Sequence, residues 1–273
     1  MRNKLWSKES NMEDRGGLPL RPPDAAISIM YDLITPFLKS DFHRYELVLL
    51  GITPEIIALP WPSNVNLRAY DQSAEMITSL WQGNIGITSS VEQACWKSLP
   101  VSDRTVDFFL GDGCTTQLGD ENAYHEIFAE MERTLHPAGK IVMRCFIRPT
   151  VKETFDQVVQ DAFAGNIKYF GSLKWRIALI LANKQDNFSI RVTDIFDTFN
   201  RLFPDRDELS RVAGWTSEMV NAIDRYSGLT TSYTFPTFNQ LEQLIKPWFK
   251  IVEVKFGNYE LGDCCPILLL DRV

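Results

Sequence analysis

The 273-residue sequence is poor in the side chains that build metal sites and disulfide frameworks. Its three histidines lack His-x-x-x-His spacing, and its five cysteines form no Cys-x-x-Cys. We therefore expect no metal site and no disulfides, and reduced thiols favour a cytoplasmic protein. No uncharged apolar run approaches the ~20 residues of a membrane-spanning helix. The polar start, residues 1–11, is not typical of a signal peptide.

Positive charge is also scarce. The formal net charge is −7, and no basic stripe appears along the chain. A protein that neutralises phosphates needs such a stripe, so a nucleic acid partner is not expected. With 45% hydrophobic and 23% charged residues, the composition is that of an ordinary globular protein.

From residue 45 onward, short apolar runs alternate with helical segments, which favours a parallel sheet with crossover helices. An apolar helix is expected earlier, over residues 25–38. The clearest helix candidate runs from Asp120, a plausible N-cap, to Leu135, and a stop and turn are expected at residues 136–139. The expected strands lie at residues 46–50, 67–70, 91–95, 106–110 and 141–146.

Residues 151–235 interrupt this alternation. They show three or four helical stretches and little strand signal, so we expect a helical insertion that buries its apolar faces on the sheet. A helix near residues 237–245 and two strands, 249–254 and 267–270, follow as an antiparallel pair. The apolar faces are Val151, Phe155, Val158, Val159, Ala162 and Phe163, then Val192, Ile195, Phe196, Phe199, Leu202 and Phe203, then Leu209, Val212, Ala213 and Val220.

A glycine and an aspartate mark a candidate binding site. Gly51 follows the first strand and permits a sharp turn, while Thr53 and Pro54 suit the start of a helix. Asp71 ends the second strand, where a carboxylate can accept hydrogen bonds from ribose hydroxyls. An aspartate that merely caps the next helix explains the spacing equally well.

The order of these elements resembles class I S-adenosylmethionine-dependent methyltransferases over residues 30–150 and 235–273. The segments that carry the resemblance are 45–55, 69–76, 95–100, 106–113 and 135–140. The resemblance implies an α/β fold with a doubly wound, mostly parallel seven-stranded sheet, an antiparallel C-terminal strand pair and a helical insertion. It divides the chain into an N-terminal arm and first helix (1–40), a Rossmann-like cofactor-binding core (41–150), a helical cap (151–235) and a C-terminal part that completes the sheet (236–273).

The resemblance also implies a role for each matching residue. The methionine part of S-adenosylmethionine is expected to face Gly51, Ile52 and Thr53, and its ribose to face Asp71. The adenine is expected beside Gln72, Met76, Cys95 and Trp96, and further contacts come from Asp112, Gly113 and Cys114. Tyr31 either closes over the cofactor or packs in the core.

Two departures from the family pattern bear on function. Only Gly51 remains of the usual two or three glycines, and Cys95, a poor hydrogen-bond acceptor, stands where an acidic residue often binds the adenine amino group.

The expected activity is methyl transfer to a small molecule, and the alternative is a catalytically inactive binding or scaffold protein. A nicotinamide oxidoreductase is disfavoured because Gly51 lacks G-x-G-x-x-G partners.

Catalysis of methyl transfer needs mainly positioning, with removal of one proton when the acceptor atom is oxygen or nitrogen. Three residues are candidate bases, each with a structural alternative: Asp112, Tyr124 and His125. Aromatic residues of the insertion are expected at the acceptor pocket or, for most of them, in the helix core: Tyr169, Phe170, Trp175, Phe196, Phe199 and Trp215.

Overall fold

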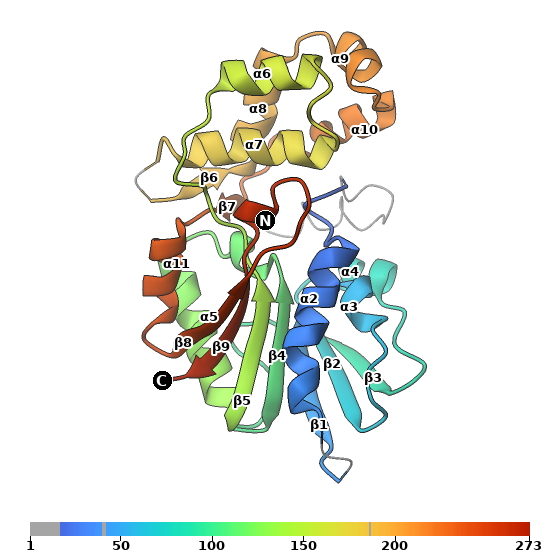
Figure 1. The fold of residues 1–273 in the computed structure, drawn as a ribbon, viewed down its shortest axis with the longest axis vertical. Coiled ribbons are helices and arrows are strands. Elements are labelled where there is room, and N and C mark those ends of the chain that lie inside the picture. Colours follow the sequence, from blue (N-terminus) through green and yellow to red (C-terminus); the bar gives the residue numbers. More distant parts are fainter. Residues whose placement is uncertain (1–16, 40–41, 186) are drawn as a thin grey trace.

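A seven-stranded sheet in the order β3-β2-β1-β4-β5-β9-β8 forms the centre of the computed structural model, which describes residues 17–39, 42–185 and 187–273 (Figure 1). The first five strands in this order are parallel, and β9 runs antiparallel to both β5 and β8. The expected fold class is thereby confirmed. The strands are β1 (Tyr45–Leu50), β2 (Val65–Asp71), β3 (Thr88–Gln93), β4 (Val106–Asp112), β5 (Leu135–Arg144), β8 (Phe249–Lys255) and β9 (Ile267–Arg272).

Helices cover both faces of the sheet because its central strands are apolar on both sides. Along β1, Leu47 and Leu49 belong to one buried cluster, whereas Val48 and Leu50 belong to the other. This alternation follows from the two-residue period of a strand. The first cluster includes α2 (Asp24–Ile34), α3 (Pro54–Ile57) and α4 (Ala74–Leu80), and the second includes α5 (Glu121–Thr134) and α11 (Phe238–Ile245).

The ends of α5 show how local sequence sets its bounds. The Asp120 side chain accepts a hydrogen bond from the backbone N–H of Ala123 at 2.9 Å, as an N-cap does. The expected turn at residues 136–139 is a bulge within β5, because Val106 pairs with Leu135 while Phe108 pairs with Lys140. The third strand was expected three residues too late. It is an edge strand whose first residues, Thr88 to Ser90, are polar, so an apolar run did not mark it.

Residues 151–235 form a helical cap beyond the carboxyl ends of the parallel strands (Figure 1). Its apolar core is continuous with Phe146, Cys264 and Cys265 of the sheet domain, so the cap packs on the sheet as expected. The cap comprises α6 (Phe155–Phe163), α7 (Phe170–Ala182), β6 (Ser189–Arg191), α8 (Val192–Leu202), α9 (Arg206–Ala213), α10 (Ser217–Asn221), the 3-10 helix η4 (Ala222–Tyr226) and β7 (Ser232–Thr234).

Three features of the cap differ from the expectations for residues 151–235. Strands β6 and β7 pair antiparallel, although little strand signal was seen. Val151 is 80% exposed and precedes α6, so it does not share that helix's apolar face. Helix α7 has eleven of thirteen residues buried, and it therefore lacks the polar stripe by which an amphipathic helix is recognised. The division into four parts stays a prediction, and its arm before residue 17 lies outside the described residues.

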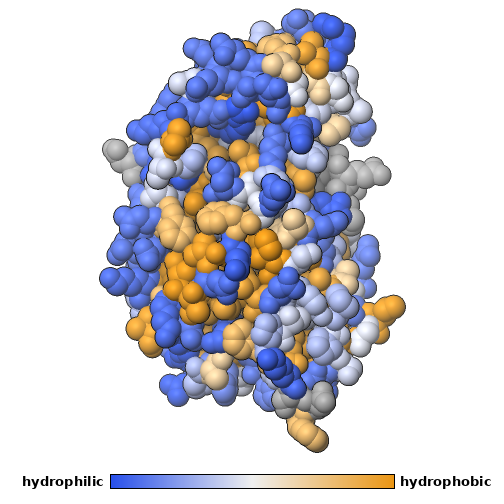
Figure 2. Space-filling model, in the orientation of Figure 1, coloured by the Kyte–Doolittle hydropathy of each residue, from blue (hydrophilic) through white to orange (hydrophobic). Residues whose placement is uncertain are grey.

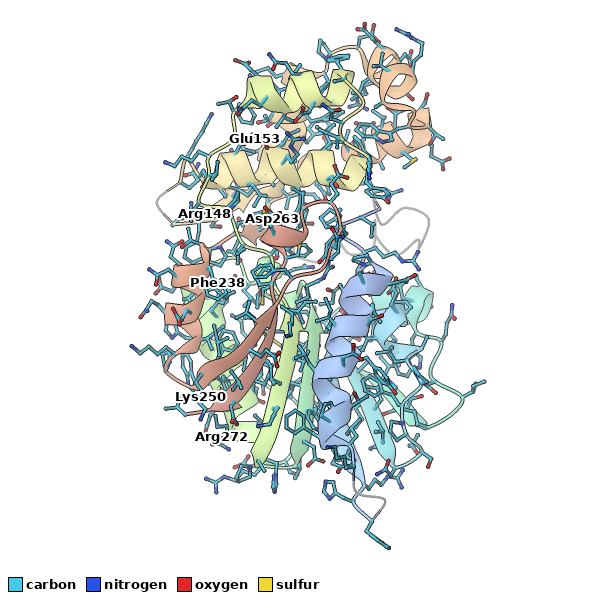
Figure 3. All side chains as sticks on the ribbon, viewed as in Figure 1. Arg148, Glu153, Phe238, Lys250, Asp263 and Arg272 are labelled. Atoms are coloured by element: carbon cyan, nitrogen blue, oxygen red, sulfur yellow. The ribbon has the colours of Figure 1, made fainter. Side chains whose placement is uncertain are left out.

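Arg148 lies where the chain leaves the sheet for the cap (Figure 3). Its guanidinium donates to the backbone oxygen of Ala182, at the end of α7, and to Gln240 Oε1 of α11 at 3.0 Å. Burial lowers the pKa of Arg148 from its usual value. One buried side chain thus ties the cap to the sheet domain.

The face shown in Figure 2 carries apolar side chains over the region where Figure 1 shows β5, β9 and β8. The edge strand β8 also carries Lys250, Glu253 and Lys255, and charge on an edge strand disfavours pairing with another chain. In the part of the chain that the structure describes, no helix is long and apolar enough to cross a membrane.

Replacing Arg148 by methionine should lower the free energy of unfolding by about 1–3 kcal/mol, because the hydrogen bonds of its charged guanidinium to the Ala182 carbonyl and to Gln240 are lost. Urea denaturation measures the change. Arg191→Met is the matched control, because Arg191 is exposed and pairs with Asp194, three residues along the chain. Equal stability of the two variants would contradict the role assigned to Arg148.

Candidate functional site

A cleft opens at the carboxyl ends of β1, β2 and β4, where the strand order reverses. Its first compartment encloses about 810 Å³, including solvent at its mouth. It is lined by Leu20, Pro22, Leu50, Gly51, Ile52, Thr53, Asp71, Met76, Trp96, Asp112, Gly113, Cys114, Thr116, Gln117, Phe146, Trp175 and Tyr233. The adjoining second compartment is lined by Asp71, Gln72, Cys95, Trp96, Lys97, Gln117, Leu118 and Ile127. Every binding residue expected from the sequence therefore lines one of the two compartments, except Tyr31.

Gly51 makes the turn that ends β1. Its φ of +90° is a conformation that favours glycine, and its N–H donates to the Tyr70 carbonyl at 2.8 Å. A Cβ at Gly51 would lie 3.5 Å from Trp96 Cζ2 and 3.8 Å from Asp71 Oδ2. Helix α3 then begins at Pro54 but spans only four residues, and the Thr53 side chain makes no capping hydrogen bond. Thr53 thus occupies the N-cap position, as expected, without a side-chain capping hydrogen bond, and it also lines the cleft.

Asp71 lies at the boundary of the two compartments, since it lines both. Asp71 is the last residue of β2, and the residue is 6% exposed. Its Oδ1 accepts from the backbone N–H of Ser73 at 2.8 Å, which fixes the carboxylate, while Oδ2 is directed toward Gly51. Ser73, rather than Asp71, caps α4 by accepting from Met76 N at 3.2 Å. The helix-capping alternative for Asp71 is thus replaced by a carboxylate held at the cleft.

Trp96 lies at the boundary of the compartments, since it lines both. Its indole N–H donates to the Tyr70 carbonyl at 2.6 Å, and its ring lies against Gly51. Gln72 and Cys95 line only the second compartment, and Met76 lines only the first. The four residues expected beside an adenine ring therefore surround the boundary between the two compartments.

A buried ion pair supports the end of β4. Asp112 and Arg144 are register partners on β4 and β5, and their side chains are 5% and 0% exposed. Two guanidinium nitrogens of Arg144 donate to the Asp112 carboxylate, with Nη2–Oδ2 at 3.1 Å. Burial acts to lower the pKa of Arg144, but the charge and hydrogen bonds of Asp112 outweigh it and raise that pKa above its usual value. Because its carboxylate is committed to this pair, Asp112 is not a ready general base.

The other candidate bases lie outside the lining of both compartments. Tyr124 is fully buried, hydrogen-bonded to Thr234 Oγ1 at 2.9 Å, and its pKa is raised by burial. The ring of His125 lies at the surface of α5 against Trp248, with ring centroids 5.1 Å apart. Neither residue reaches the cleft.

Tyr31 is also away from the cleft. Its hydroxyl donates to the Pro60 carbonyl at 2.8 Å, and its ring packs edge-on against Trp61. This is the packing role that the sequence left open as an alternative. Among the aromatic residues proposed for an acceptor pocket, Trp175 lines the first compartment, whereas Phe170, Phe199 and Trp215 belong to the core of the cap.

Several lining residues were not found from the sequence. Thr116 and Gln117 belong to the 3-10 helix η3 (Cys114–Gln117). Their one signal in the sequence is their position immediately after the motif at residues 106–113. Tyr233 lies in the three-residue strand β7, which is too short to give a pattern. Leu20, Pro22, Leu50 and Phe146 are the remaining additions to the first compartment, and Lys97, Leu118 and Ile127 are those to the second.

Among the described residues, no group of three or more His, Cys, Asp or Glu side chains could hold a metal ion. The polar groups of the cleft are mainly carboxylates, amides and hydroxyls between apolar walls, with Lys97 in the second compartment, an arrangement typical of sites for small organic molecules.

Comparison with solved structures identifies the fold. A SAM-dependent methyltransferase from Methanosarcina mazei superposes with a TM-score of 0.52 at 15% sequence identity, covering 87% of this chain and 97% of that one. A protein from Rhodobacter sphaeroides named as a Zn-dependent alcohol dehydrogenase gives a TM-score of 0.62 at 11% identity, covering 99% of each chain. No family model matches the sequence, and no curated protein is similar to it. The chain therefore has the Rossmann-like fold of class I SAM-dependent methyltransferases, as its motif order suggested.

Thiol reactivity tests the placement of the cysteines around the cleft. Cys95 is exposed, whereas Cys114, Cys145, Cys264 and Cys265 are buried. Burial raises the pKa of Cys145 and Cys265 to about 12, so both stay protonated and unreactive at pH 8. Ellman's reagent should therefore give one fast equivalent in the native protein, and Cys95→Ser should remove it. A second fast equivalent in the folded protein would contradict this arrangement.

Proposed function

We propose that the protein transfers a methyl group from S-adenosylmethionine to a small-molecule acceptor bound under the cap. The observation that carries the proposal is the Asp71 carboxylate, which is held at the end of β2 beside Gly51 and lines both compartments. In a doubly wound fold this is where a nucleoside sugar is bound.

The residues around Asp71 suit the rest of the cofactor. Asp71 would accept hydrogen bonds from the two ribose hydroxyls. The second compartment, with Leu118 and Ile127 as apolar walls and Gln72 as a polar group, suits a flat base. Gly51, Ile52 and Thr53 would face the methionine part in the first compartment, toward Gly113 and Cys114. S-adenosylmethionine supplies an activated methyl group on a sulfonium. The protein therefore needs mainly to bind and orient the two reactants.

The protein's own contribution is positioning of the acceptor in a compartment whose mouth is open to solvent. Cys114 stays protonated because burial raises its pKa, and Asp112 is held by Arg144. Lysine and histidine are absent from the described residues that line the first compartment. An acceptor proton would therefore pass to water rather than to a side chain, and the rate would depend on how well the cleft aligns the acceptor.

A catalytically inactive binding protein is the second candidate function. The observation that favours it is the Trp96 ring, which lies against Gly51 where the family pattern has open glycine backbone. Such a protein would bind its ligand in the cleft without turnover. Product formation with a panel of small-molecule acceptors separates this candidate from the methyltransferase.

Asp71→Asn tests the site directly. The amide oxygen can still accept from Ser73 N, but the lost charge should weaken S-adenosylhomocysteine binding by about 1.5–3 kcal/mol, and Asp71→Ala should weaken it at least as much. Titration calorimetry measures both variants. Asp107→Asn is the control, because Asp107 near the start of β4 also accepts a backbone hydrogen bond, from Glu46, but lines neither compartment. Unchanged affinity in Asp71→Asn would remove Asp71 from the site.

A further inference from the structure

Three buried polar atoms beside the first compartment have no hydrogen-bond partner. They are Thr116 Oγ1, Gln117 Oε1 and Trp175 Nε1. All three residues line the compartment, and Thr116 and Trp175 are each only 2% exposed. Buried polar groups in folded proteins are nearly always paired, and a bound molecule with complementary polar atoms would pair these three.

The walls around these groups are aromatic and held in place by their neighbours. The Trp175 ring lies edge-on to Phe146, with centroids 5.2 Å apart, and contacts Tyr233 at 5.6 Å. The Arg144 guanidinium lies over the Phe146 ring at 5.0 Å, and so the ion pair with Asp112 also positions this wall. Rings fixed in this way favour a planar, apolar ligand body.

The charges of the compartment disfavour a ligand with a net negative charge. Its described lining contains no Lys, Arg or His, and its charged members are the carboxylates Asp71 and Asp112. The positive charge of Arg144 is neutralised by Asp112. A carboxylate or phosphate ligand that carries no cation of its own would find no counter-charge here, and burying an unpaired charge is costly. The methionine part proposed for this compartment differs, because its ammonium group balances its carboxylate.

The polar atoms also exclude a simple ammonium ligand. The indole N–H of Trp175 is a donor only and needs a lone pair, which an ammonium group does not have. Gln117 Oε1 accepts a hydrogen bond, and the Thr116 hydroxyl can either donate or accept. A neutral hydroxyl group satisfies both kinds of partner.

We infer that this part of the cleft binds a neutral, planar aromatic molecule that carries a hydroxyl group, and that the Trp175 indole N–H selects the oxygen. The role of this molecule as the methyl acceptor rests on the proposed function. In that role its oxygen lone pair forms the new bond to carbon, the sulfur keeps the electron pair of the broken bond, and the hydroxyl proton passes to water.

Three probes that differ in one substituent test the inference. They are 2-naphthol, which is neutral and hydroxylated, naphthalene, which has no polar group, and 2-naphthoate, which is anionic. Titration calorimetry at pH 7 should give binding of 2-naphthol at least tenfold tighter than binding of 2-naphthoate. Comparable or tighter binding of 2-naphthoate overturns the inference.

Two variants test the named atoms. Trp175→Phe keeps an aromatic ring but removes the N–H. It should weaken 2-naphthol binding about tenfold and keep the affinity for naphthalene within twofold of the wild-type value. Thr116→Val should weaken only 2-naphthol, by a smaller factor. Trp215→Phe is the control, because the Trp215 indole donates to the Lys168 carbonyl at 3.1 Å and lies outside the compartment. Equal losses for 2-naphthol and naphthalene in Trp175→Phe overturn the inference.

A parallel titration with S-adenosylhomocysteine separates this inference from the proposed function. If that ligand fails to bind while 2-naphthol binds in a Trp175-dependent way, the methyltransferase proposal fails and the aromatic site stands. If S-adenosylhomocysteine binds and 2-naphthol does not, the site inference fails and the proposed cofactor site stands.

Discussion

The position of β1 between β2 and β4 is the constraint on which the rest of the molecule depends. Strand β1 pairs with β2 on one side and with β4 on the other. The connections that leave the ends of β1 and β4 therefore diverge to opposite faces of the sheet. The crevice left between them is lined by the last residues of three strands. Gly51, Asp71 and Asp112 meet there because each ends one of those strands or follows it directly.

The buried pair of Asp112 and Arg144 links this crevice to the cap. Taking both charges out of water is costly and is offset only when their geometry is good and their hydrogen bonds are made. The pair holds the end of β4 to the end of β5, and Arg144 in turn supports the Phe146 ring that begins the aromatic wall. The same pairing withdraws the carboxylate from use as a base. One interaction therefore shapes both the proposed cofactor site and the proposed acceptor site.

The sequence predicted the centre of the sheet well because the central strands are buried on both faces and most of the helices that cover them are apolar on one side. The apolar run at residues 46–50 and the Asp120 cap of α5 are local signals that tertiary packing does not override. Helix α7 was not located for the opposite reason. It is buried on nearly all sides, and so it carries no periodic contrast between apolar and polar residues.

The candidate site was predictable where a strand end fixes a side chain. Asp71 was found in this way, whereas Tyr31 was placed only by family resemblance and instead hydrogen-bonds to Pro60. Tyr233 and Trp175 could not be assigned from their neighbours in sequence. Their place in the lining depends on the cap folding back over residues more than one hundred positions earlier in sequence, such as Gly51 and Asp71.

Isothermal titration of the wild-type protein with S-adenosylmethionine, and separately with NADH, is the most direct measurement of the central claim. The account predicts one molecule of S-adenosylmethionine bound per chain and no heat of binding with NADH. Absence of S-adenosylmethionine binding to the folded protein, or preferential binding of NADH, would contradict the assignment of this cleft.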